Sequence, residues 1–87
     1  MTVEEIKNLV LVRLIVVARD EAMTFENVAG RPLNGLTEAN FYQVAVEQMR
    51  SDRFLRATDG FDIDDPYFFD AELTYAGRQL ALQLTTA

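Results

Sequence analysis

The sequence contains neither cysteine nor histidine, and it has no apolar run long enough to span a membrane. These absences exclude disulfides, thiolate chemistry, imidazole bases and the commonest zinc sites. The run Leu9 to Ala18 has only ten residues and includes Arg13, whereas a membrane-spanning helix needs about 20. Glu4 and Glu5 stand where a signal peptide would have positive charge, so we expect a cytoplasmic protein.

The chain has 87 residues, of which 49% are apolar, and this is enough for one hydrophobic core. A domain of this size buries only roughly 60–65% of its unfolded surface and is marginally stable alone. We therefore expect one domain over residues 1–87, which a second copy or another partner would stabilise.

The net charge of −6 is unevenly distributed. Residues 1–58 contain eight acidic and seven basic residues, and residues 73–87 contain a single charged residue, Arg78. The excess lies in an acidic segment without any basic residue: Asp59, Asp62, Asp64, Asp65, Asp70 and Glu72. DNA is held mainly by Lys and Arg side chains that neutralise its phosphates, so this segment should be repelled by a duplex.

The first 22 residues are predicted to form a helix. Thr2 and Glu5 have the spacing of a capping box, which favours a helix over the strand that the valine-rich run 9–17 would also suit. One stripe at helical spacing is expected to face the core: Val3, Ile6, Val10, Leu14 and Val17. Four apolar residues outside this stripe are a candidate dimer face, unless the helix is simply buried at the centre of the monomer: Leu11, Val12, Ile15 and Val16.

Residues 23–36 are interrupted by Gly30, Pro32 and Gly35, which excludes a second long helix. Residues 24–28 are predicted to form either one helical turn or a short strand, with Phe25 and Val28 pointing inward.

A second long helix is predicted over residues 37–52, with Thr37 as its N-cap. Its polar arc, extended by Arg53, is a possible DNA-contacting face: Asn40, Gln43, Glu47, Arg50 and Arg53. Asn and Gln can bond adenine, Arg can bond guanine and Glu can accept from cytosine. The same residues are equally typical of a solvated surface, and Glu38 and Glu47 would face the DNA phosphates.

Residues 54–73 are predicted to form an antiparallel hairpin, with Phe69, Ala71 and Leu73 on its inner face and Phe68 on its outer face. Exposed aromatic residues beside carboxylates suit a protein contact. We therefore interpret one set as an acidic wing that binds a partner: Asp59, Asp62, Asp64, Asp65, Tyr67, Phe68 and Asp70.

The acidic segment does not fit a calcium loop, because a loop that starts at Asp62 has Pro66 at its fifth position and Tyr67 where glycine is needed. No cofactor motif is present, and nothing in the sequence would desolvate these carboxylates for acid–base catalysis. We expect no metal site, no cofactor and no enzymatic activity.

The last helix is predicted over residues 74–84, with Thr74 as its N-cap and with Ala76, Leu80 and Leu84 facing the core. The segment Leu73-Thr74-Tyr75-Ala76-Gly77-Arg78, together with the block from Phe41 to Phe54, resembles the winged-helix superfamily. It is more closely similar to small phage-derived winged-helix proteins of the YjcQ type. The resemblance covers roughly residues 36–84 and rests on Phe41, Ala45, Val46, Met49, Phe54, Leu55, Leu73, Thr74 and Gly77.

The resemblance implies a small α+β domain with three main helices and a hairpin wing, and it implies DNA binding through the helix at residues 37–52. The acidic wing departs from that expectation. Two functions therefore stay open. The first, which the acidic segment favours, is a non-enzymatic interaction protein of phage or mobile-element origin that binds a basic protein surface through its wing. The alternative is a dimeric DNA-binding transcriptional regulator.

Overall fold

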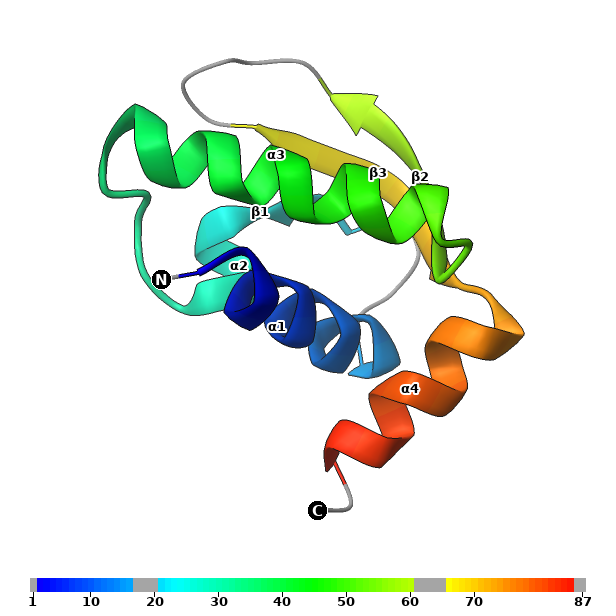
Figure 1. Cartoon of the computed structure of the whole chain (residues 1–87). Coiled ribbons are helices and arrows are strands. Elements are labelled where there is room, and N and C mark those ends of the chain that lie inside the picture. The colour runs from blue at the N-terminus through cyan, green and yellow to red at the C-terminus, as the bar shows by residue number, and fades with distance from the viewer. Residues whose placement is uncertain (1, 17–20, 61–65, 86–87) are drawn as a thin grey trace.

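The chain folds as a small α+β domain in which helices pack on a three-stranded antiparallel sheet. The computed structural model describes residues 2–16, 21–60 and 66–85. Its elements are α1 (Val3–Val16), β1 (Met23–Thr24), α2 (Phe25–Ala29), α3 (Gly35–Ser51), β2 (Leu55–Gly60), β3 (Tyr67–Leu73) and α4 (Tyr75–Thr85). The strands lie in the order β1-β3-β2, and α1 packs against both α3 and α4 (Figure 1). The described residues thus form four helices, where the sequence predicted three main ones.

Helix α1 begins as predicted and ends earlier than predicted. The Thr2 amide donates to Glu5 Oε1 and the Glu5 amide donates to Thr2 Oγ1, both at 3.2 Å, which confirms the capping box. The described helix ends at Val16, and Glu21 and Ala22 are not helical, so the prediction of a helix to residue 22 is wrong. Arg13 forms an ion pair with Glu21 at 2.8 Å, whereas residues eight apart in one helix would be separated by about 12 Å along its axis.

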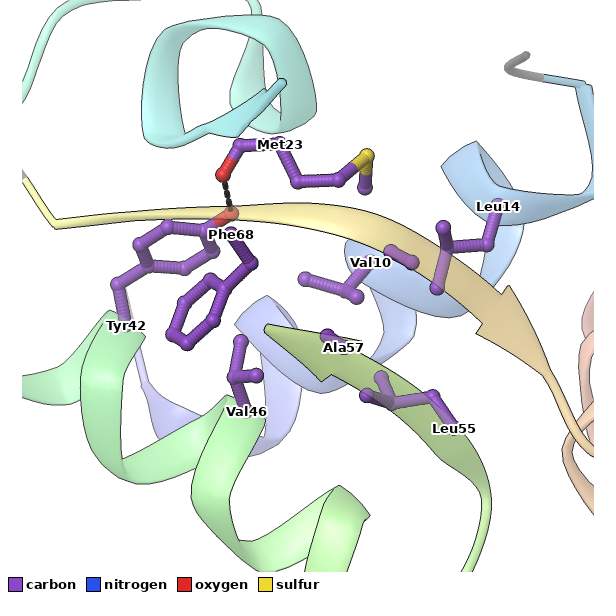
Figure 2. Close-up of a pocket in the computed structure, with 9 residues that line it drawn as sticks. Val10, Leu14, Met23, Tyr42, Val46, Leu55, Ala57 and Phe68 are labelled. Atoms are coloured by element: carbon purple, nitrogen blue, oxygen red, sulfur yellow. Dashed lines mark hydrogen bonds between the residues drawn. The ribbon is translucent and has the colours of Figure 1, made fainter. Parts of the chain in front are cut away.

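The core is centred on the aromatic ring of Tyr42. This ring packs edge-on against Phe25 at 5.7 Å and against Phe68 at 5.6 Å between ring centroids. Its hydroxyl donates to the Met23 carbonyl oxygen at 2.6 Å (Figure 2). A cavity of about 10 Å³ lies beside these side chains, and its lining is apolar. A water molecule needs at least about 10–15 Å³ and polar partners, so this cavity is a packing defect and not a ligand site.

Of the two alternatives for residues 24–28, the structure has the helical turn, α2, and the preceding strand β1 reaches only Thr24. Thr24 belongs to β1 and also caps α2, because its Oγ1 accepts a hydrogen bond from the Asn27 amide at 3.1 Å. Phe25 and Val28 are buried, as predicted.

Helix α3 starts two residues before the predicted N-cap, Thr37. Its N-cap is Asn34, which makes no side-chain capping bond. The Asn34 amide instead donates to Glu38 Oε1 at 3.0 Å, so a carboxylate inside the helix satisfies the exposed backbone group. The predicted role of Thr37 as N-cap is therefore wrong.

The predicted hairpin is present, but its inner face changes side within β3. Arg56 pairs with Glu72 and Thr58 pairs with Phe69, so two residues of β3, Asp70 and Ala71, lie opposite one residue of β2. This is a β-bulge, and Asp70 has the positive φ of 51° that such bulges often require. The extra residue reverses the alternation of side chains between the two faces.

The bulge explains two errors in the predicted burial. Phe68 is only 4% exposed and belongs to the core, whereas Phe69 is 37% exposed. The sequence predicted Phe68 on the outer face and Phe69 on the inner face, and both predictions are wrong. After the bulge the prediction is confirmed, because Ala71 is buried and Leu73 packs against the core.

Helix α4 has the predicted cap and a different inner face. Thr74 Oγ1 accepts a hydrogen bond from the Gly77 amide at 3.1 Å. Gly77 and Ala81 are buried and Leu80 is half-buried, whereas Ala76 and Leu84 are exposed, so the predicted stripe is wrong at its two ends. A Cβ on Gly77 would overlap the Phe54 carbonyl oxygen, so the glycine lets the helix approach the backbone closely at this point.

Candidate functional site

The polar arc predicted for α3 lies on the surface of the domain. Asn40 and Glu47 are exposed, and Gln43 and Arg50 are half-buried. Residues spaced by three or four positions share one face of a helix, so these four side chains form a row along α3. The opposite side of the helix is in the core, where Tyr42, Ala45, Val46 and Met49 are buried.

Glu38 does not belong to this exposed face, contrary to the expectation that it would face the phosphates. Its carboxylate is bound by both terminal nitrogens of the Arg31 guanidinium, Nη1 to Oε1 and Nη2 to Oε2, each at an N···O distance of 2.7 Å, and the residue is 9% exposed. The Arg31 guanidinium also lies over the Phe25 ring, 5.2 Å from its centroid. The hydrogen bonds from Arg31 lower the pKa of Glu38 to about 2, and the same pairing raises the pKa of Arg31.

Arg53 follows α3 in an unusual backbone conformation. Its φ is 61°, in the left-handed region that favours glycine. The Phe54 amide donates to the Met49 carbonyl at 2.9 Å and the Arg53 amide donates to the Arg50 carbonyl at 3.1 Å. These two bonds form a Schellman motif, with Arg53 at the position after the C-cap where glycine is most common.

A surface cleft opens beside Arg53, between the end of α3, the start of β2 and the first turn of α4. Its volume is about 510 Å³. Seven residues line it: Arg50, Arg53, Leu55, Arg56, Thr74, Tyr75 and Ala76. Tyr75, which is 81% exposed, was not predicted as a site residue. No pattern within either helix indicates that the start of α4 lies beside the end of α3.

The acidic wing can be placed only in part. Asp62, Asp64 and Asp65 lie outside the described residues, as does the side chain of Asp59. Tyr67 and Asp70 are exposed, as the interpretation requires. Phe68 is in the core, so its predicted role in partner binding is wrong.

A different aromatic residue, Phe69, shares the outer face of the sheet with Tyr67. The two ring centroids are 6.5 Å apart, and each residue is exposed by slightly more than a third. The Tyr67 ring covers Gly60 on the neighbouring strand, where a Cβ would overlap it.

The candidate dimer face on α1 separates into buried and exposed residues. Leu11 is 2% exposed and belongs to the core, so it is unavailable to a second subunit. Ile15 is half-buried, whereas Val12 and Val16 are 38% and 73% exposed. Val12 also lines a surface groove with Leu84 of α4.

Within residues 2–16, 21–60 and 66–85, no three acidic side chains are grouped closely enough to hold a metal ion. Among the helices of these ranges, none has the length and apolar character needed to cross a membrane.

Comparison of the chain with protein-family models, with curated proteins and with solved structures found no significant match.

Proposed function

We propose that the chain is a winged-helix protein that binds double-stranded DNA through the exposed face of α3. The order helix, strand, helix, helix, strand, strand supports this classification, since α3 is the last helix before the hairpin, as the resemblance implies. The antiparallel sheet, with β1 added to the hairpin, supports it further.

The row of exposed and half-buried side chains on the outer side of α3 is the observation on which the proposal rests. Asn40 and Gln43 can each make two hydrogen bonds to adenine, and Arg50 can make two to guanine. Glu47 can accept a hydrogen bond from cytosine. From Gln43 to Arg50 the helix rises about 10 Å, which is comparable to the roughly 12 Å width of the major groove.

The Arg31–Glu38 pair removes one objection to DNA binding. An unpaired carboxylate at Glu38 would repel phosphates at the start of α3. Because both carboxylate oxygens of Glu38 are bound by Arg31 and the residue is only 9% exposed, its charge is compensated by that of Arg31. This pairing favours α3 over the acidic wing as the binding surface.

The proposal is tested by the binding of random-sequence duplex DNA, measured by fluorescence anisotropy over a salt series. We expect binding at low salt that weakens steeply as salt rises, because phosphate contacts release counterions. The variant Gln43→Ala removes a base-reading side chain, and Gln79→Ala removes the same side chain from an exposed position of α4 as a control. If neither the wild type nor the control binds at low salt, the proposal fails.

A second candidate function is supported by the exposed pair Tyr67 and Phe69, which the exposed Asp70 follows in the sequence. Aromatic residues with carboxylates around them suit a protein partner with a basic surface. Replacing Asp62, Asp64 and Asp65 by Asn separates the two functions. The change should abolish binding of a basic protein, whereas it should leave DNA binding intact or strengthen it.

The DNA-binding form is proposed to be a homodimer, because operators with two half-sites match proteins with two-fold symmetry. The exposed apolar residues Val12 and Val16 support α1 as the contact.

A further inference from the structure

The cleft beside Arg53 gathers positive charge in a protein whose net charge is −6. Three of its seven lining residues are arginines, Arg50, Arg53 and Arg56. Among the acidic residues that the structure describes, none lines the cleft. Glu72 lies nearby, with Oε1 at 3.8 Å from Arg56 Nη1. This distance is about 1 Å longer than a strong charge-assisted hydrogen bond, and the Arg56 side chain is 77% exposed, so its guanidinium stays open to a ligand.

The backbone at Arg53 favours glycine, yet the residue is an arginine. Its left-handed conformation is fixed from both sides, by the Schellman bonds of α3 and by the Thr74 hydroxyl, which donates to the Arg53 carbonyl oxygen. The Thr74 amide also donates to the Phe54 carbonyl at 3.1 Å. Strained residues that the surrounding structure holds in place are concentrated at binding sites. The positive φ of an arginine at position 53 thus marks its side chain as a candidate binding group.

The first turn of α4 adds two features to the cleft. Tyr75 presents an exposed aromatic ring. The N-terminus of this 11-residue helix has a partial positive charge, and the Thr74 hydroxyl satisfies the Gly77 amide there. The cleft is thus lined both by arginine residues and by the first turn of a helix.

We propose that the cleft is a phosphate site, and that the phosphate belongs to the backbone of the DNA whose groove α3 reads. The planar fork of an arginine matches the oxygens of a phosphate. Arg50 ends the row of α3 side chains and also lines the cleft, so a base contact and a phosphate contact are adjacent. The identity of the ligand as DNA rests on the proposed function. The phosphate chemistry rests on the cleft alone.

The variant Arg53→Gly tests this site, because it deletes the guanidinium and relieves the backbone. We expect its Tm to rise by about 3 °C, since glycine adopts a positive φ without strain. Its affinity for duplex DNA should fall about tenfold, and the dependence of log affinity on log salt should become less steep by about 0.9. The matched control Arg78→Gln removes one positive charge from exposed α4 outside the cleft and should change the affinity less than twofold.

Equal losses of DNA affinity in Arg53→Gly and Arg78→Gln would overturn the proposal, because net charge alone would then explain them. No loss in Arg53→Gly would overturn it as well. If the wild type binds no duplex, inorganic pyrophosphate is titrated into both proteins and the Tyr75 ring is followed by NMR. A shift of the ring signal in the wild type and not in Arg53→Gly supports the phosphate site while rejecting DNA as its source. Absence of a shift in the wild type overturns the site.

Discussion

The Tyr42 hydroxyl donates a hydrogen bond to the Met23 carbonyl oxygen at 2.6 Å, and this bond joins the middle of α3 to the edge strand β1. Both residues are almost completely buried. β1 has only two residues, so this bond is a side-chain link that ties a very short strand to α3.

Replacing Tyr42 by Phe should lower the free energy of unfolding by about 1–2 kcal/mol, because the buried Met23 carbonyl oxygen would lose its partner. Urea unfolding followed by circular dichroism measures the change. Tyr75→Phe removes the same hydroxyl from a residue that is 81% exposed and should cost less than about 0.5 kcal/mol. Equal effects of the two variants would contradict this account.

Acid should destabilise the domain through Glu38. Its pKa is about 2 in the folded state and has a reference value of 4.5. The unfolded chain therefore binds the proton more readily, so the stabilisation is complete above about pH 4.5 and is lost as the pH falls toward 2. Thermal unfolding at a series of pH values should show this loss in the wild type and a weaker loss in Glu38→Gln. Glu47→Gln, on the exposed face of the same helix, should behave as the wild type.

The stability of the domain should depend on how easily residue 70 adopts the left-handed backbone conformation of the bulge. Asp70→Gly should leave the Tm unchanged or raise it, because glycine adopts a φ of 51° without a steric penalty. Asp70→Ala should be less stable than Asp70→Gly by about 1 kcal/mol, since a Cβ is disfavoured in the left-handed region. Thermal unfolding of the two variants gives the order, and the reverse order would argue against a left-handed residue 70.

Gly77→Ala should destabilise the domain, although alanine is the better helix former. The added methyl group would overlap the Phe54 carbonyl oxygen, and such overpacking typically costs about 1–3 kcal/mol. Chemical denaturation measures the effect. Arg78→Ala, at the next and exposed position, should stay within about 0.5 kcal/mol of the wild type. A higher stability of Gly77→Ala would mean that α4 does not approach the backbone of Phe54.

The proposed homodimer should dissociate when Val16 is replaced by Glu. Val16 is 73% exposed in the monomer, so the change should not unfold the domain. Light scattering gives the mass in solution. Leu36→Glu is the control, because Leu36 is 63% exposed on α3 and lies outside the α1 face. If light scattering gives the mass of a monomer for the wild type, the proposed homodimer is wrong.

Features that depend on residues close together in the sequence were predicted correctly. Thr2 and Glu5 are three residues apart, as are Thr74 and Gly77, and both caps are present as predicted. The predicted face of β3 was wrong because it depends on pairing with another segment of the chain. The bulge at Asp70 depends on pairing with β2, so simple alternation placed Phe68 on the wrong face.

The same division applies to the candidate site. Helical spacing placed Asn40, Gln43, Glu47 and Arg50 on one side of α3, because their positions depend on one helix only. Glu38 was misplaced because its partner, Arg31, precedes the helix across a turn. The cleft was missed because it joins segments that are far apart in the sequence.

The hydrogen bonds of Thr74 determine which parts of the hairpin can change in length or sequence. The backbone and hydroxyl of Thr74 fasten the start of α4 to Phe54 and Arg53, the two residues that lead out of α3. The residues just before β2 and just after β3 are thus hydrogen-bonded to each other, and these bonds do not involve the strands themselves. Lengthening a connecting loop costs little entropy. Insertions or replacements between β2 and β3 should therefore leave both helices in place, so the connection between the two strands is the part of the domain in which new sequences can be grafted.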